Sequence, residues 1–372
     1  MTIRHRVVCI AEDRKSCEPA LKLLLVSLNR HNAGTPVVVF YPAADREFIE
    51  WVKILESENI SVRKTWPRGL HGWNVKPHLM LELLNDGNEE ILWIDSDILV
   101  TGNVFVAIGD LADDTLVTSE ECLQNQNETK AIRARLWGFS VKREFQFPLN
   151  SGVMRVTRHH LPLLVRWKEL LESPNYQNAQ RLPMNIRPRH QFSDQDVLTA
   201  LLCSDKFHDI PIKILRRGRD IIQYYGEMGF TLAERVVCML KGMPTFLHQQ
   251  GSKPWLADPD EKPKGLRGRL VIAYLDLSPY TTAVMGLSAA PLPSWTRARS
   301  KLSSVLRLIG FGYPQLTGLP LAIVFDLERL ARLPRQAVRN VVEALCPEFV
   351  AALRARRRAR QADRSLPDIS NT

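Results

Sequence analysis

The sequence predicts an α/β fold whose mostly parallel β-sheet is covered by helices on both faces. Three observations lead to this prediction. Short apolar segments rich in β-branched residues alternate with segments of helical periodicity in the N-terminal part of the chain. These apolar segments are continuous, which is typical of strands buried on both faces. The composition, with 45% hydrophobic and 24% charged residues, is that of a globular protein and excludes a disordered or fibrous chain.

The expected strands and helices alternate in order along the chain. The first strand, 6–11, is a short apolar run, and the helix 16–30 places four leucines on one face. The next strand, 35–41 (TPVVVFY), is β-branched and continuous. Parallel strands joined in this way have right-handed connections, and binding sites lie beyond their carboxyl ends. The remaining expected elements are the helices 45–56 and 77–84 and the strands 60–62 and 90–94.

The segment 252–265 (SKPWLADPDEKPKG), rich in proline and lysine, is the expected domain boundary. The α/β domain then spans 1–258, and a basic, largely helical extension spans 266–372. That extension holds 16 lysines and arginines against 7 aspartates and glutamates, whereas the whole 372-residue chain has a formal net charge of +10. Because the excess charge lies in the extension, the α/β domain is close to neutral, which argues against a nucleic-acid-binding core.

Two carboxylates, Asp95 and Asp97, follow the apolar strand 90–94. If the strand continues through them, its two-residue period places both on one face. Like charges so placed repel each other unless a cation neutralises them. A hard divalent cation such as Mg²⁺ or Mn²⁺, held by carboxylates and a substrate phosphate, does this. The alternative is a solvated turn after a buried strand.

Two further segments carry polar groups that can serve a site. In 149–154 (LNSGVM), Asn150 can hydrogen-bond a sugar hydroxyl and Gly152 lets a ligand approach the backbone, unless the segment is only a strand-initiating turn. The segment 193–198 (SDQDVL) is a predicted helix start, with Ser193 as N-cap and Asp196 in a capping-box-like position. That arrangement leaves Asp194 and Gln195 free at the positive end of the helix.

The segment 248–255 (HQQGSKPW) follows a strand-like run. His248 can supply a metal ligand, Gly251 a close backbone approach, and Lys253 a phosphate partner. The alternative is a structural histidine.

Taken in order, the motifs IDSD, NSGV, SDQDVL and HQQGSKPW resemble those of glycosyltransferase family 8. This family of retaining GT-A transferases includes bacterial lipopolysaccharide galactosyl- and glucosyltransferases and glycogenin. The resemblance covers 6–255 and implies the GT-A nucleotide-diphospho-sugar transferase fold, with a Rossmann-like sheet between helices. It also implies metal-dependent transfer of a hexose from UDP-glucose or UDP-galactose to a glycan, lipid-linked or other acceptor, in cell-surface polysaccharide biosynthesis.

The resemblance also implies roles for individual residues. Asp95, Asp97 and His248 match the metal ligands, and the imidazole favours Mn²⁺ over Mg²⁺. Asp194 and Gln195 match the catalytic pair beside the anomeric carbon. An aromatic residue that the family commonly has after the first strand has no counterpart in 14–19 (RKSCEP). The residues that match donor and nucleotide contacts are Ala11, Glu12, Asp13, Lys76, Asp95, Ser96, Asn150, Ser151, Gly152, Gly251 and Lys253.

A mechanism follows from these roles. The metal, Lys253 and Lys76 would stabilise the departing diphosphate, unless Lys76 is only a solvated lysine at a helix start. Asp194 is a better candidate nucleophile than Gln195, and front-face attack with the leaving phosphate as base is favoured over a covalent intermediate. The segment 123–147 is expected to cover the donor. Its aromatic residues lie on the acceptor side or in the core: Trp137, Phe139, Phe145 and Phe147.

Two other classes of function compete with this interpretation. The segment 94–100 (IDSDILV) resembles the first motif of haloacid-dehalogenase-like phosphohydrolases, but that motif normally begins its domain. A non-catalytic protein could instead bind nucleic acid through the arginine cluster 354–360.

The extension admits three interpretations. Leu302, Val305, Leu306 and Ile309 form an apolar stripe beside basic residues, and 338–353 carries a second stripe. Both can pack on the protein or on a second subunit, dock on an anionic membrane, or precede a nucleic-acid-binding cluster.

A cytoplasmic location is expected, with attachment to the inner face of the plasma membrane as the alternative to a free protein. The N-terminal sequence lacks the apolar segment of a secretory signal. The run 270–290 is interrupted by Asp276 and Pro279, so no spanning helix is expected. The six cysteines are scattered, and most are expected to be reduced and buried or half-buried.

Overall fold

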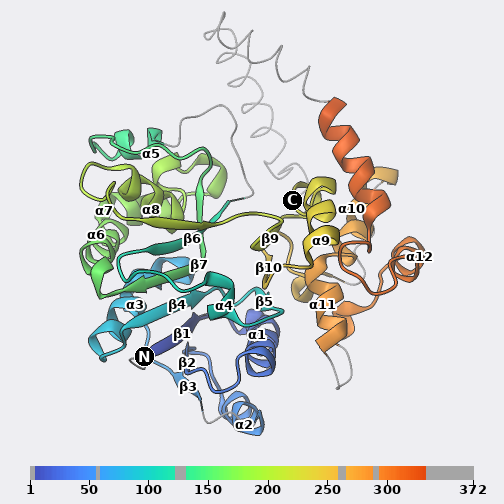
Figure 1. Cartoon of the computed structure of the whole chain (residues 1–372), viewed down its shortest axis with the longest axis horizontal. Helices are drawn as coiled ribbons and strands as arrows, with labels where there is room; N and C mark the ends of the chain where they lie inside the picture. The colour runs from blue at the N-terminus through green and yellow to red at the C-terminus, as the bar shows by residue number, and fades with distance from the viewer. Residues whose placement is uncertain (1–4, 56–58, 122–130, 259–264, 288–292, 332–372) are drawn as a thin grey trace, which may run out of the picture. The chain divides into compact units, whose positions relative to one another are not determined.

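The computed structural model of the chain describes residues 5–55, 59–121, 131–258, 265–287 and 293–331. Its main feature is a seven-stranded sheet with the order β3-β2-β1-β4-β7-β6-β8 (Figure 1). Among these strands β7 runs antiparallel to its neighbours β4 and β6, and the other pairs are parallel. The expected α/β fold with a mostly parallel sheet is therefore confirmed. The strands are β1 (Arg6–Ala11), β2 (Val37–Phe40), β3 (Ile60–Arg63), β4 (Glu90–Ile94), β6 (Leu116–Glu120), β7 (Leu149–Thr157) and β8 (Ile212–Leu215).

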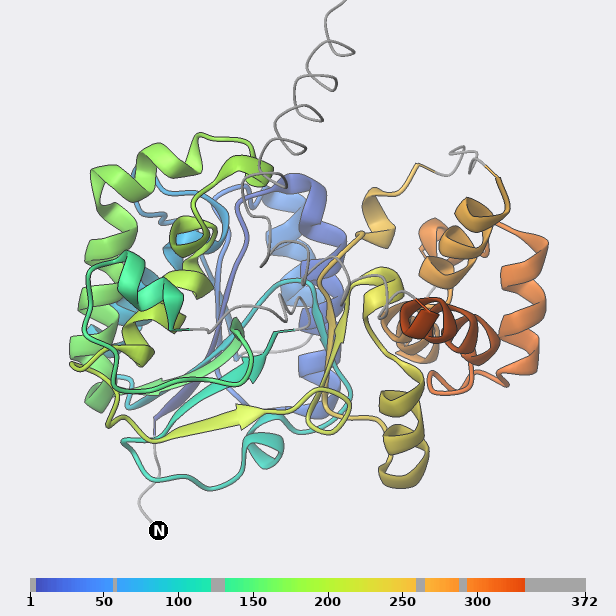
Figure 2. The same cartoon turned by 90° about the horizontal axis from the view of Figure 1, so that it is seen from above.

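Helices cover both faces of this sheet (Figure 2). Successive residues of β1 show the division, because Val8 packs in one hydrophobic core and Cys9 in the other. One core contains the buried leucines of α1 (Glu18–His31) and Phe48 of α2 (Arg46–Ile54). Burial on both faces explains the continuous apolar runs in β1 (residues 7–10) and in β2. The other core lies under α3 (Lys76–Asn85), α6 (Leu161–Glu172) and α8 (Asp194–Cys203).

A second, three-stranded sheet lies beyond the end of β4. Its strands are β5 (Ile98–Val100), β10 (Phe246–Gln249) and β9 (Ile221–Tyr224), with β10 in the centre. Strand β5 begins directly after Asp97, so the turn that carries the two aspartates joins the two sheets. His248 lies on β10 opposite Ile98, which brings a residue far away in the sequence next to this turn.

The chain divides into two compact units, Met1–Leu319 and Pro320–Thr372. The helices α9 (Leu232–Lys241), α10 (Gly265–Asp276), α11 (Pro279–Leu287) and α12 (Lys301–Ile309) belong to the first unit. Tyr224 of β9 donates a 2.7 Å hydrogen bond to the Tyr274 carbonyl and so ties α10 to the second sheet. A folding boundary within 252–265 stays a prediction. The second apolar stripe, 338–353, and the arginine cluster, 354–360, lie outside the described residues.

Helices α10 and α11 together are long and apolar enough to cross a membrane, and they are the one such stretch in the part of the chain that the structure describes. An 18-residue part of this stretch has a mean hydropathy of 1.3, and 56% of that part is buried within the protein. A helix in a protein core meets the same criterion. Asp276 in this stretch accepts hydrogen bonds from Arg299 Nε at 2.6 Å and from Ser303 Oγ at 2.8 Å, which fixes it to the first turn of α12 and to the segment before that helix.

Four cysteines in the described ranges are free and buried, as expected from their scattered positions: Cys9, Cys17, Cys203 and Cys238.

Candidate active site

A cavity of about 850 Å³ opens at the carboxyl ends of β1 and β4. This is where an α/β sheet is expected to bind its ligand. Ser151, Gly152 and Gly251 are not among its lining residues. The predicted site residues that line it are Ala11, Glu12, Asp13, Lys76, Asp95, Ser96, Asp97, Asn150, Asp194, Gln195, His248 and Lys253.

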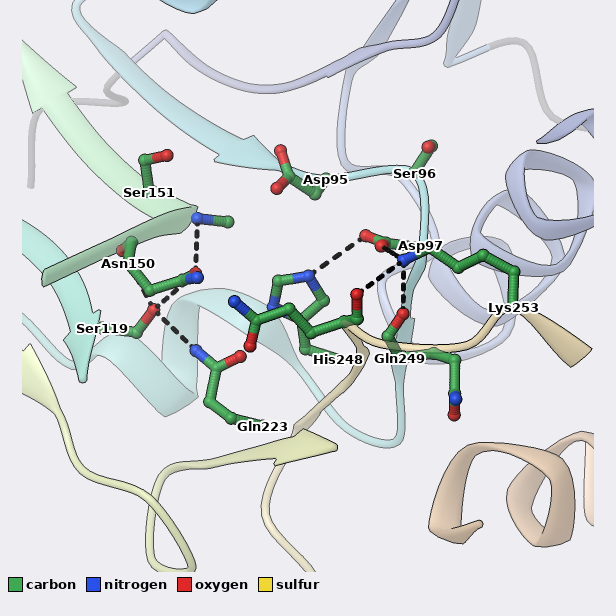
Figure 3. Close-up of polar contacts among 12 residues, drawn as sticks. Asp95, Ser96, Asp97, Ser119, Asn150, Ser151, Gln223, His248, Gln249 and Lys253 are labelled. Atoms are coloured by element: carbon green, nitrogen blue, oxygen red, sulfur yellow. Dashed lines mark hydrogen bonds and ion pairs between the residues drawn. The ribbon is translucent and has the colours of Figure 1, made fainter. Parts of the chain in front are cut away.

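A turn, and not a continued strand, brings the two aspartates together. Strand β4 ends at Ile94, and the Ile98 N–H donates to the Asp95 carbonyl at 3.0 Å to close the turn. The condition for aligning the two carboxylates by the two-residue strand period, a strand that continues through Asp95 and Asp97, is therefore not met. In Figure 3 Asp97 points toward His248 and Lys253, whereas Ser96 points away from them. The Ser96 hydroxyl donates to Glu12 Oε2 at 2.6 Å, so it fixes the turn against the end of β1.

Asp95, Asp97 and His248 form a group that fits a divalent metal ion. Their ligand atoms all lie within 4.8 Å of one another, and His248 Nε2 is 3.2 Å from Asp97 Oδ1. The Nδ1 atom of His248 is buried and has no hydrogen-bond partner among the described residues. Two carboxylates and one imidazole suit Mn²⁺, and Mg²⁺ less well.

Lys253 lies against the same aspartate. Its ammonium forms an ion pair with Asp97 and donates to the Gln249 carbonyl at 2.5 Å (Figure 3). Burial disfavours the charged form of Asp97, but Lys253 and His248 outweigh burial and hold the pKa of Asp97 below its usual value. Asp97 is therefore ionised over the neutral pH range, as a metal ligand must be.

Lys76 is the buried cation on the other side of the site. Only 3% of the residue is exposed, which excludes a solvated lysine at the helix start. Its ammonium lies 3.0 Å from Asp95 Oδ1 and donates to Ser151 Oγ at 2.8 Å. Burial alone would lower the pKa of Lys76, but Asp194 and Asp95 raise it above its usual value. The lysine therefore remains a cation inside the protein.

Asp194 stands next to this lysine, with 3.6 Å between its Oδ2 and Lys76 Nζ. The same oxygen accepts a 2.7 Å hydrogen bond from Ser151 Oγ. Burial raises the pKa of Asp194 to about 6, although Lys76 and Ser151 oppose the shift. At neutral pH the buried carboxylate is mainly ionised and already engaged by two partners.

Gln195 follows in the first turn of α8 and contacts Asn150 of β7. Asn150 Nδ2 donates to Gln195 Oε1 at 3.1 Å. The helix begins differently from the expected capping box, because the Ser193 side chain caps no backbone N–H. The Ser193 hydroxyl instead donates to Asp196 Oδ2 at 2.7 Å, and Asp196 pairs with Arg133 Nε at 2.5 Å.

Gly152 is required by a side chain of the protein itself. A Cβ at this position would lie 2.7 Å from His248 Cε1 and 2.9 Å from Asn150 Oδ1. The expected role of Gly152, close approach of a ligand to the backbone, stays a prediction. Gly251 likewise packs on the Tyr225 backbone, since its Cβ would lie 3.2 Å from Tyr225 Cα.

The residues after β1 face the cavity but are held by neighbours. Glu12 pairs with Arg14 Nε at 2.8 Å, and Asp13 Oδ2 accepts from the Gly72 N–H at 3.0 Å. The other oxygen of Asp13, Oδ1, is buried without a hydrogen-bond partner in the described ranges.

Several cavity residues were missed by the sequence reasoning. Trp66, Trp73 and Tyr225 line the cavity, although no aromatic residue occurs in 14–19. Glu121, directly after β6, is buried beneath Asn150, Gln195 and Gln250. A sequence pattern could have indicated Glu121, because 116–121 (LVTSEE) is a strand that ends in carboxylates, as 90–97 does.

The aromatic residues of 137–147 were expected either on the acceptor side of the site or in the core, and the structure packs them against the core. Trp137 and Phe139 stack with ring centroids 6.4 Å apart, and Trp137 Nε1 donates to the His190 carbonyl at 2.9 Å. Phe147 is 6% exposed and packs in the same core as α3 and α6.

Neither a protein-family model nor a curated protein matches the chain. Among solved structures, it is similar to the glycosyltransferase GlyE of Streptococcus pneumoniae TIGR4, with 17% identity over 74% of this chain and a TM-score of 0.44. The chain spans 60% of the length of that GlyE structure.

Two other similar structures are the galactosyltransferase LgtC, solved with donor and acceptor sugar analogs, and mouse xyloside xylosyltransferase 1. LgtC is 15% identical over 68% of this chain and 90% of its own, with a TM-score of 0.44. The mouse enzyme is 13% identical over 66% of this chain and 97% of its own, with a TM-score of 0.42. Because these TM-scores are below 0.5, the interpretation of the site rests on its own residues and geometry.

Proposed function

We propose that the protein is a metal-dependent glycosyltransferase that moves a hexose from a nucleotide-diphosphate sugar to an acceptor. One observation carries the proposal. The carboxylate–imidazole group of Asp95, Asp97 and His248 opens on the same cavity as two buried or half-buried lysines, Lys76 and Lys253. A metal ion and two ammonium groups around one cavity suit a diphosphate better than a neutral substrate.

The resemblance in motifs makes this proposal more specific. It favours a retaining enzyme of glycosyltransferase family 8, Mn²⁺ as the metal, and UDP-glucose or UDP-galactose as donor. The acceptor would be a glycan or a lipid-linked saccharide of the cell surface.

The residues of the site divide the chemistry between them. Bound Mn²⁺ would act as a Lewis acid that neutralises the diphosphate leaving group. Lys253 holds Asp97 in its ionised form and adds positive charge on the same side of the cavity. Lys76 supplies a second fixed cation beside Asp95. Charges fixed in this way need no reorganisation as the leaving group becomes anionic.

The geometry around Asp194 favours front-face attack. The carboxylate accepts a hydrogen bond from Ser151 and lies near the Lys76 ammonium. Its negative charge is therefore already stabilised by two partners, which lowers its reactivity. Such a carboxylate is a better electrostatic stabiliser of a cation-like anomeric carbon than a nucleophile. In this proposal the leaving phosphate takes the acceptor proton, and Gln195 contacts the reacting sugar.

A screen of nucleotide sugars tests the proposal. The purified protein is incubated with each sugar nucleotide and Mn²⁺ or EDTA, and nucleoside diphosphate release is measured. We expect Mn²⁺-dependent release from at least one UDP-hexose and its loss in Asp97→Ala and His248→Ala. Release of phosphate from simple phosphate esters without turnover of any sugar nucleotide would contradict the proposal and support a phosphohydrolase.

We also propose that the protein meets its acceptor at an anionic membrane surface on the cytoplasmic side. The proposal is supported by α12 and the residues that follow it. Leu308 is 77% exposed and Phe311 79% exposed, and Phe311 has a φ of 48°, a strained conformation for a bulky residue. The sequence 277–325 contains no aspartate or glutamate, so nothing acidic within it repels anionic lipid.

The exposed face of α12 differs from the expected stripe. Leu306 is buried, and Arg307 turns inward to the Thr296 carbonyl at 2.5 Å. The residues that present apolar surface are Leu302, Val305, Leu308, Ile309, Phe311 and Tyr313.

Flotation with vesicles of anionic and of zwitterionic lipid tests the membrane proposal. We expect the protein to float with anionic vesicles and the double variant Leu308→Glu/Phe311→Glu to lose this binding. Leu240→Glu on α9 is the matched control, because Leu240 is 80% exposed on another helix of the same unit. Equal flotation of the double variant and the wild type would refute it.

A further inference from the structure

Glu121 is a buried carboxylate that contacts three amide side chains at once. It is 2% exposed and follows the last residue of β6. Its Oε2 accepts hydrogen bonds from Asn150 Nδ2 at 2.9 Å, from Gln195 Nε2 at 2.7 Å and from Gln250 Nε2 at 2.7 Å. These three amides come from β7, α8 and the loop after β10, so Glu121 joins three separate segments of the site.

The three amides line the cavity, whereas Glu121 is not among its lining residues. Both carboxyl oxygens of Glu121 accept hydrogen bonds from these amides. Each amide must therefore turn its NH₂ group toward Glu121. If one of them flipped, a carbonyl oxygen would face the carboxylate, and a buried acceptor would lose its donor.

The same orientation continues through the neighbouring hydrogen bonds. With its NH₂ group on Glu121 and Gln195, Asn150 uses its Oδ1 to accept from the Gly152 N–H at 2.8 Å. Gln195 Oε1 accepts from Asn150 Nδ2 at 3.1 Å. The amides of Asn150 and Gln195 each have one orientation that satisfies these neighbours, and Glu121 selects it.

We infer that Glu121 is a positioning residue that fixes the amides of Asn150 and Gln195 in the orientation that transfer requires. The inference rests on the proposed glycosyl transfer and deepens it. The carbonyl dipole of Gln195 would then stabilise the cation-like anomeric carbon, whereas a flipped amide would present an N–H to it. Binding of the donor diphosphate does not depend on this orientation, so Glu121 acts on kcat more than on the donor KM.

Glu120 provides a matched control. It is the preceding residue, it is 8% exposed, and it pairs with Arg216 Nε at 2.9 Å. It contacts none of the three amides in the described hydrogen bonds. A general effect of removing a buried carboxylate from this end of β6 would therefore appear in Glu120→Gln as well.

The test compares purified Glu121→Gln and Glu120→Gln with the wild type in the Mn²⁺-dependent donor assay. Glutamine keeps the size of glutamate but carries its own NH₂, which allows the neighbouring amides to flip. We expect kcat of Glu121→Gln to fall about 10- to 100-fold with the donor KM within about threefold of wild type. Glu120→Gln should retain kcat within about twofold. In Glu121→Asp, which keeps the carboxylate at a shorter reach, kcat should fall about 3- to 10-fold.

Three results overturn the inference: kcat of Glu121→Gln within twofold of wild type, an equal fall in Glu120→Gln, or a rise in the donor KM with kcat unchanged. If Glu121→Gln does not fold, kcat of Glu121→Asp is measured in its place. An unchanged kcat in Glu121→Asp also overturns the inference. If the wild type turns over no sugar nucleotide, the proposed function fails first, and that outcome is distinct from an active wild type with an insensitive Glu121.

Discussion

Replacing Gly152 by alanine places a methyl group against the imidazole of His248. The new Cβ would lie 2.7 Å from His248 Cε1 and 3.1 Å from His248 Nδ1. Carbon atoms in contact normally stay about 3.5–4.0 Å apart, so the ring or the strand must move by about 1 Å. The strand has little freedom to move, because the Gly152 carbonyl accepts a 2.8 Å hydrogen bond from the Asp95 N–H. We therefore expect the ring to move.

A shift of that size exceeds the tolerance of about 0.2 Å for metal–ligand distances. The Mn²⁺ affinity of Gly152→Ala should fall by at least about 10-fold, and turnover by about 100-fold. Overpacking should cost about 1–3 kcal/mol of unfolding free energy, which leaves the protein folded if its stability is ordinary.

Titration calorimetry with Mn²⁺, combined with turnover and urea unfolding, measures all three effects. Gly286→Ala on α11 is the control, because its Cβ would meet no atom within 4 Å. If Gly152→Ala binds Mn²⁺ as tightly as Gly286→Ala and retains turnover, His248 is not a ligand whose position matters, and the reasoning is refuted.

Three further predictions concern stability. Burial lowers the pKa of His160 to about 4, whereas in the unfolded chain the ordinary value is about 6.5. The free energy of unfolding should therefore fall by about 3 kcal/mol as the pH is lowered from 6.5 toward 4. Urea unfolding at several pH values should show that the free energy of unfolding of His160→Asn depends less on pH than that of the wild type. The same pH dependence in both proteins would contradict the prediction. Lys76→Met leaves the buried carboxylate of Asp194 and the half-buried carboxylate of Asp95 without their cation and should cost about 3 kcal/mol in the same assay. A cost below about 1 kcal/mol would argue against a buried ion pair. Arg235→Met removes a guanidinium that donates hydrogen bonds to the carbonyls of 314, 315 and 317. Amide hydrogen exchange in 313–319 should therefore be faster in this variant. Unchanged exchange rates there would contradict the prediction.

The strands could be predicted from the sequence because their local signal is strong. The expected strand 90–94 matches β4 residue for residue, since the strand is buried on both faces and four of its five residues are apolar. The reason for Gly152 could not be predicted, because it depends on His248, which is 96 residues later in the chain and reaches β7 only through the second sheet.

The candidate site was predictable where short motifs carry its residues. Asp95, Asp97 and His248 belong to such motifs, and the fold brings them together. For Glu121 the sequence offered only a strand that ends in carboxylates, and its role could not be predicted from that, because its partners lie on three segments that are distant in sequence. For Ser193 a local motif predicted a contact that is not formed. Its hydroxyl donates to Asp196, which pairs with Arg133, and does not cap a backbone N–H.

The central claim is that Asp95, Asp97 and His248 hold a metal ion that binds a nucleoside diphosphate. Calorimetric titration of UDP into the protein, with Mn²⁺ and with EDTA, tests it most directly. We predict binding that weakens at least about 10-fold in EDTA, and a metal effect that disappears in Asp97→Ala. Equal binding of UDP with and without Mn²⁺, or no binding in either condition, would contradict the claim.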